Sequence, residues 1–136
     1  MATDKPARTA EVREYFRKVF KSDDVFNDIA PLIERCPEAV YHWAEARRAV
    51  LGDDAKTALS PKVKELVILG IEVATRKVND PPMGHARMAV DAGATVQEVA
   101  EVIALCLLLG GMMTFRESGR FALKAAIERA RELGRA

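Results

Sequence analysis

Apolar residues recur every three or four positions along most of the chain, which is the spacing of an apolar stripe on a helix. In residues 9–21, for example, Val12, Phe16 and Val19 fall on one such stripe. Strand signals are nearly absent, because no segment alternates cleanly between apolar and polar residues and no Asn-Gly or Asp-Gly turn separates β-branched runs. The pattern therefore predicts an all-α protein.

Proline and glycine mark the helix ends in the first part of the chain. A short helix with apolar positions over 25–33 is predicted to end at Pro37. The next helix should run over 37–51 with Val40, Trp43, Ala44, Arg47 and Val50 inward or partly inward, and Gly52 should close it. Residues 52–59 are predicted to form a linker.

Two further helices begin with the same pair of signals, a capping side chain followed by proline. The cap accepts hydrogen bonds from free amides, and proline occupies the first helical position without losing an intrahelical hydrogen bond. The pairs are Ser60-Pro61, opening a helix to about residue 76, and Asp80-Pro81, opening a helix that ends at Gly93, with a loop over 77–82 between them.

Thr95 with Glu98 three residues later is a capping box, and it predicts a helix over 96–109. The second half of this helix, 102–109, is apolar all round, so we expect neighbours to cover every side and the helix to be central. Two glycines then precede a final helix over about 114–133. In so short a chain, a helix without a solvated face predicts that a second subunit supplies part of the cover. We expect a homo-oligomer, either a trimer or a hexamer.

Length and charge narrow the class of protein. The chain has 136 residues and is 49% hydrophobic, which is enough for one core but too short for two ordinary domains, so residues 1–136 should form one domain. The 21 basic and 20 acidic residues nearly balance, which gives no reason to expect nucleic acid or an anionic membrane as partner. The start of the chain lacks the pattern of a signal peptide, and no apolar run approaches the roughly 20 residues of a membrane span. We expect a cytoplasmic protein.

Two cysteines occur, Cys36 and Cys106, and both are expected to be reduced in the cytoplasm. The two cysteines and two histidines lack the spacing of zinc ligands, so we expect neither a metal nor another cofactor.

Three stretches form an ordered set over residues 59–112. They are Leu-Ser-Pro-Lys-Val-Lys-Glu-Leu-Val-Ile-Leu from Leu59, His-Ala-Arg-Met-Ala-Val-Asp-Ala-Gly-Ala-Thr from His85, and Glu-Val-Ala-Glu-Val-Ile-Ala-Leu from Glu98. This set resembles the carboxymuconolactone decarboxylase family, which shares a two-helix hairpin with the alkylhydroperoxidase D proteins. The resemblance implies an alkylhydroperoxidase-D-like bundle of about six helices with a central buried helical hairpin.

The sequence departs from the peroxidase members of this superfamily. Those proteins place Cys-x-x-Cys ahead of the histidine, whereas Val78 and Pro81 stand at the matching positions here. Thiol chemistry on peroxides needs a thiolate and a resolving thiol, so it is not carried over. Glu65 and His85 are also 20 residues apart, one more than in the family pattern, and the extra residue should lie in the 77–82 loop.

His85 is the leading catalytic candidate, because imidazole can give or take a proton near neutral pH. Its place near a helix start disfavours the imidazolium form. The resemblance implies that His85 lines a pocket and that Glu65 faces it as proton partner or orienter. The alternatives are a packing role for His85 and a solvated charged face for Glu65. Arg87 points about 200° around the helix from His85, so we interpret it as a surface charge.

Four further residues are candidates for substrate binding. Glu72 shares a helical stripe with Glu65, Leu69 and Arg76, and a plain charged surface with a Glu72–Arg76 pair is the favoured interpretation unless the stripe meets another subunit. Methionines near the hairpin suit an adaptable apolar pocket, although filling gaps in a core is commoner. An arginine suits recognition of a carboxylate, with a surface role as the alternative. These last candidates are Met83, Met112 and Arg116.

The resemblance implies a carboxy-lyase that acts on a small cyclic carboxylate from the catabolism of aromatic compounds, or related isomerase chemistry. One alternative is an alkylhydroperoxidase-type antioxidant in which Cys36 or Cys106 replaces the missing pair. The other is a helical oligomer that binds a small molecule without turnover. Because one fold hosts many activities, the residues of the site have to decide between them.

Overall fold

The computed structural model describes residues 5–21, 23–52, 57–77 and 81–135, except for the side chains of residues 5 and 81–83. All regular secondary structure in these ranges is helical, which confirms the all-α class. None of the helices in these ranges is long and apolar enough to cross a membrane.

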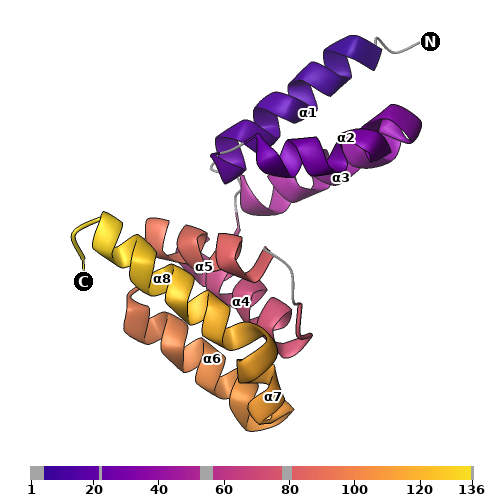
Figure 1. Ribbon diagram of the computed structural model, residues 1–136. Helices are drawn as coiled ribbons and strands as arrows, with labels where there is room; N and C mark the ends of the chain where they lie inside the picture. Colours follow the sequence, from indigo (N-terminus) through magenta and orange to yellow (C-terminus); the bar gives the residue numbers. More distant parts are fainter. Residues whose placement is uncertain (1–4, 22, 53–56, 78–80, 136) are drawn as a thin grey trace. The chain divides into compact units, whose positions relative to one another are not determined.

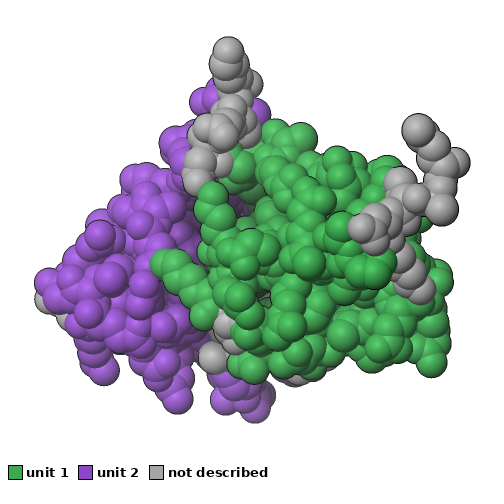
Figure 2. All heavy atoms as spheres, turned by 90° about the horizontal axis from the view of Figure 1, so that it is seen from above, with its two compact units in different colours: residues 1–56 green, residues 57–136 purple. Residues whose placement is uncertain are grey.

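The chain divides into two compact units, residues 1–56 and residues 57–136, which are coloured separately in Figure 2. Each unit has a buried apolar cluster of its own. The single domain expected from the sequence stays a prediction.

The first unit consists of α1 (Lys5–Phe20), α2 (Asp24–Arg35) and α3 (Pro37–Leu51). Its core centres on Phe16, which is 1% exposed and contacts the rings of Phe20, Phe26 and Trp43. The bounds of α3 are those predicted. Trp43 is partly inward as predicted, since it is 47% exposed and stacks on Phe16, whereas Val50 is 58% exposed and the prediction for it is wrong. Val50 lies in the last turn of α3.

The second unit contains the segment that carries the family resemblance (Figure 1). In it α5 packs against α4 and α8, while α6 packs against α4 and α8 from another direction. The core is built mostly from small aliphatic side chains, which lets these helices approach closely. Its helices are α4 (Pro61–Ala74), α5 (Pro81–Asp91), α6 (Val96–Gly110), α7 (Met112–Thr114), the π-helical turn η1 (Phe115–Gly119) and α8 (Arg120–Glu132).

The helix starts predicted from capping residues are confirmed at α4 and α6, whereas α1 begins at Lys5, ahead of the predicted residue 9. The Ser60 hydroxyl accepts a hydrogen bond from the Val63 amide at 3.3 Å. Thr95 and Glu98 form the reciprocal capping box, with distances of 3.1 Å and 2.8 Å. Pro81 opens α5 as expected, but its proposed cap, Asp80, lies outside the described residues.

The end of the chain differs from the continuous α-helix predicted over 114–133, because residues 115–119 form a π-helical turn. Gly119 explains how this turn fits against α6. A Cβ atom at Gly119 would lie 2.8 Å from the Ile103 side chain, so only glycine allows so close an approach. A single π turn inside a helix inserts one residue and often occurs beside functional sites.

The prediction that neighbours cover α6 on every side is wrong for the single chain. Leu105, Leu108 and Leu109 are 62%, 77% and 90% exposed, because α4 and α8 pack against only part of the helix. The stripe Val63, Val67 and Ile71 of α4 is also exposed. We call these six residues the α4–α6 apolar face.

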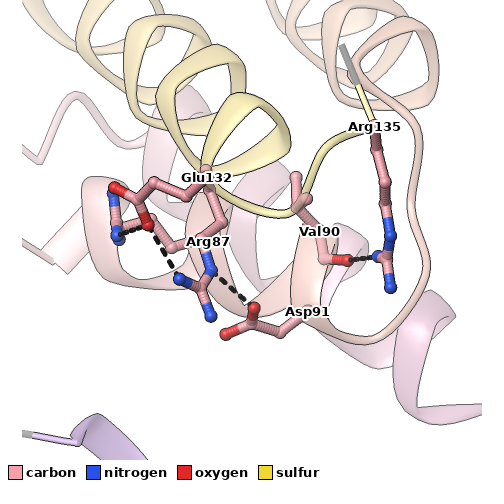
Figure 3. Close-up of polar contacts among 6 residues, drawn as sticks. Arg87, Val90, Asp91, Glu132 and Arg135 are labelled. Atoms are coloured by element: carbon pink, nitrogen blue, oxygen red, sulfur yellow. Dashed lines mark hydrogen bonds and ion pairs between the residues drawn. The ribbon is translucent and has the colours of Figure 1, made fainter.

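Polar contacts fasten α5 to α8 at the end of the unit (Figure 3). Arg87 Nη2 lies 2.7 Å from Glu132 Oε2, and Arg135 donates to the Val90 carbonyl at 2.9 Å. Arg87 is partly exposed and is engaged with α8, which agrees with its interpretation as a charge outside the site.

Candidate active site

The stripe of α4 that carries Glu65, Leu69 and Glu72 faces the interior of the second unit. Glu65 and Glu72 are seven residues apart, which is two helical turns or about 10.5 Å along the axis. Leu69, which is fully buried, lies between them on the same stripe. Glu72 is only 7% exposed, so its interpretation as part of a solvated surface is wrong. The exposed arc of α4 is instead apolar, with Val67 and Ile71 at 49% and 58%.

The predicted pairing of Glu72 with Arg76 also gives way to other contacts. Arg76 donates to the Gly110 carbonyl at 3.3 Å and pairs with Glu117 at 3.7 Å. These contacts draw the arginine toward the end of α6 and the π turn. The Glu72 carboxyl is therefore not paired with Arg76 and is buried in the second unit.

His85, in the second turn of α5, brings the two glutamates of α4 into one site. Its Nδ1 atom lies 2.7 Å from Glu65 Oε2, and its Nε2 atom lies 3.8 Å from Glu72 Oε1. The three side chains are only 13%, 14% and 9% exposed, in the order His85, Glu65 and Glu72. The predicted juxtaposition of Glu65 with His85 is confirmed, while their catalytic roles stay predictions.

The two imidazole nitrogens have different surroundings. Glu65 can accept a hydrogen bond from Nδ1–H, an arrangement that orients the ring and favours one tautomer. The 3.8 Å between Nε2 and Glu72 exceeds hydrogen-bond length. Nε2 is therefore the nitrogen available to exchange a proton with a bound molecule.

Glu72 has an unusual environment for a carboxyl group. Burial raises its pKa above the ordinary value, the nearby Glu65 charge raises it further, and the charges of His85 and Lys77 oppose this shift. Its Oε2 atom is buried and has no hydrogen-bond partner in the part of the chain described. The site thus contains two different carboxyl groups. Glu65 orients the imidazole, and the raised pKa of Glu72 favours the neutral form of the Glu72 carboxyl itself.

Lys77 and Ser118 belong to the surroundings of the site but were missed in the sequence. The buried Ser118 hydroxyl of the π turn donates to the Lys77 carbonyl at 3.0 Å. This contact holds the backbone of Lys77 after α4. The charge of Lys77 in turn lowers the pKa of Glu72. A π turn leaves no clear periodicity in the sequence, so this contact could not have been predicted.

The other residues predicted to bind substrate make no hydrogen bond or ion pair with His85 in the described part of the chain. Met112 is 59% exposed after Gly111, and Arg116 is exposed on the π turn. Among the described residues, no hydrogen bond or ion pair joins Arg116 to His85 or to either glutamate. The Met83 side chain lies outside the described residues, so a role in binding stays a prediction for all three.

The cysteines lie in different surroundings. Cys106 donates a hydrogen bond to the Gly70 carbonyl at 3.3 Å, and burial raises the pKa of its thiol, which disfavours the reactive thiolate. Cys36 is exposed in the first unit, and neither cysteine forms a disulfide. No group of three or more acidic, histidine or cysteine side chains able to hold a metal is found among the described residues.

Comparison with known proteins now identifies the family. No curated protein matches the sequence. The fold matches the crystal structure of a proposed carboxymuconolactone decarboxylase from Burkholderia xenovorans LB400, with a TM-score of 0.80, 23% identity and 96% of each chain covered. The model of the carboxymuconolactone decarboxylase family matches residues 37–126, a span that includes Glu65, Glu72 and His85. The chain belongs to the carboxymuconolactone decarboxylase family.

Proposed function

We propose that this protein is an acid–base carboxy-lyase for a small cyclic, unsaturated carboxylate of the kind produced when aromatic rings are opened. The observation that supports the proposal is the buried contact between His85 Nδ1 and Glu65 Oε2, which leaves Nε2 free for proton transfer. The Burkholderia protein of the same fold carries the decarboxylase name, which agrees with this reaction class.

The reaction begins when the carbon–carbon bond to the substrate carboxylate breaks. Carbon dioxide leaves, and the electron pair passes into the conjugated lactone carbonyl to give an enolate. Imidazolium Nε2–H of His85 then donates its proton to carbon, the enolate electrons form the new C–H bond, and solvent returns the proton to the ring. Glu65 holds the imidazole in place through its contact with Nδ1.

Binding of the substrate would use the remaining candidates. Arg116 offers a guanidinium suited to a carboxylate, and Met83 and Met112 offer adaptable apolar contacts to a ring. Met112 is 59% exposed in the single chain, and pockets often lie at boundaries between subunits, so a second subunit would complete the site.

The test of this function is turnover of 4-carboxymuconolactone, followed as the loss of its absorbance. We expect the wild-type protein and a Cys36→Ser/Cys106→Ser double variant to turn over at the same rate, since the proposed chemistry uses no thiol. No turnover by the wild type would remove the decarboxylase assignment. Reduction of a hydroperoxide by the wild type that is lost in the double variant would support the alkylhydroperoxidase-type alternative, and ligand binding without turnover would support the non-catalytic one.

We also propose that the protein is a homo-oligomer in which a second copy covers the α4–α6 apolar face. Apolar side chains there are up to 90% exposed, a patch that a soluble monomer rarely keeps. We expect Leu109→Glu to reduce the molar mass measured by light scattering, because a carboxylate cannot be buried cheaply against an apolar partner. Lys124→Glu, a charge change at an exposed position of α8, is the control and should leave the mass unchanged. A monomeric wild type would contradict the proposal.

A further inference from the structure

Glu72 carries the least explained polar atom in the second unit. It is more than nine-tenths buried, and its Oε2 atom has no hydrogen-bond partner among the described residues. Leaving a buried polar atom unpaired costs free energy, so such an atom is usually hydrogen-bonded to a water molecule, an ion or a ligand. The atom belongs to the carboxyl group that faces His85 Nε2 at 3.8 Å.

The charged surroundings of Glu72 indicate which ligand this carboxyl suits. Within α4, Glu65 adds negative charge, and His85 of α5 and Lys77 after α4 add positive charge. Other titratable groups that contact α4 from α6 and the π turn are already engaged, Glu98 with Lys62, Cys106 with the Gly70 carbonyl, and Glu117 with Arg76.

An ionised Glu72 would repel the anionic substrate class proposed above, whereas a neutral carboxylic acid can donate a hydrogen bond to an anion. Burial is the largest influence on Glu72 and raises its pKa, which favours the neutral form. A carboxylic acid kept neutral in this way is an effective donor to a developing enolate oxygen. Because a neutral Glu72 carries no charge, it needs no counter-ion in the interior.

We propose that Glu72 keeps its proton in the folded protein and donates a hydrogen bond from its unpaired carboxyl group to the anionic oxygen of the ligand beside His85 Nε2. The oxygen is the enolate oxygen formed as carbon dioxide leaves, so Glu72 is a catalytic residue that stabilises the intermediate while His85 protonates carbon. The inference rests on the proposed function for the identity of the enolate, but a bound anion tests it without turnover.

The probe is 2,4-dinitrophenolate, a planar oxyanion whose visible absorbance reports that it is ionised. Its dissociation constant is measured by calorimetry for the wild type, Glu72→Gln and Glu72→Leu from about pH 5 upward, which is above the ordinary pKa of a glutamate. Glutamine is neutral at every pH and keeps an N–H donor, whereas leucine has none. The three proteins differ only at residue 72.

We expect the wild type and Glu72→Gln to bind alike at the acidic end, and Glu72→Leu to bind at least about tenfold more weakly. As the pH rises and Glu72 ionises, wild-type affinity should fall faster than that of Glu72→Gln. Three results would each overturn the proposal: no binding by the wild type, equal binding by Glu72→Leu, or tighter binding by Glu72→Gln already at the acidic end.

Protein stability gives an independent measurement of the same proton. Between the ordinary glutamate pKa and the raised one, the folded protein binds a proton at Glu72 that the unfolded chain has lost, so stability falls as the pH rises through this interval. The difference in unfolding free energy between wild type and Glu72→Gln should therefore shift in favour of the variant as the pH rises. A difference that stays constant with pH would show that Glu72 is ionised in the fold and would overturn the proposal.

Discussion

Replacing His85 with alanine is expected to lower kcat/KM for 4-carboxymuconolactone by a factor of about 10² to 10⁴, the usual contribution of a positioned acid or base. The variant loses the nitrogen that donates the proton, and it also leaves the buried Glu65 carboxyl without its 2.7 Å partner. Wild-type and variant rates are compared as the initial loss of substrate absorbance at saturating and limiting concentrations.

Arg87→Ala is the matched control for His85→Ala. Arg87 lies on the same helix but contacts Glu132 of α8 at the other side, so this variant should keep its rate. Thermal unfolding of both variants separates a chemical effect from loss of the fold. Equal turnover by His85→Ala and wild type would exclude His85 as the acid, whatever the other residues of the site do.

The elements that could be predicted from the sequence are those with local causes. Ser60-Pro61 and the Thr95–Glu98 capping box fix helix starts through hydrogen bonds within one turn, so their outcome does not depend on the rest of the fold. The contact of His85 with Glu65 was implied by the family resemblance, and it is present although the two residues lie one position farther apart than in the family pattern.

The orientation of α4 could not be obtained in the same way. Its two arcs are distinguishable by periodicity, but hydrophobicity assigns the arc of Val67 and Ile71 to the interior and the arc of Glu65 and Glu72 to water, and the structure has the reverse. An apolar arc is also stable on the surface if another copy of the chain covers it, and a glutamate pair is stable inside if it contacts a histidine. Both conditions are tertiary or quaternary, so the helix sequence alone does not contain them.

The same reversal accounts for Glu72, which the sequence pattern favours as a surface charge. Its position four residues before Arg76 is the favourable arrangement for an exposed ion pair. Arg76 instead contacts Gly110 at the end of α6 and Glu117 in the π turn, both more than 30 positions farther along the chain. Contacts from distant parts of the chain thus override the local preference for an exposed helical pair.

Leu69 provides the stability test of this inward orientation. It lies between the two glutamates on the stripe and is fully buried, so Leu69→Ala should destabilise the protein by about 2–5 kcal/mol through lost burial and the cavity left behind. Leu133→Ala is the control for the same chemical change at a position that is 37% exposed at the end of α8, where we expect about 1 kcal/mol or less. Unfolding in urea followed by circular dichroism gives both values.

The single tryptophan makes the same experiment report on domain organisation, since Trp43 lies in the first unit and Leu69 in the second. If residues 1–136 unfold as one cooperative domain, Leu69→Ala should shift the fluorescence transition of Trp43 by as much as the circular dichroism transition. A Trp43 transition that stays in place while the helical signal shifts would contradict the single domain predicted from the length of the chain. A Leu69→Ala effect no larger than that of Leu133→Ala would contradict the burial of the stripe on which the proposed active site is built.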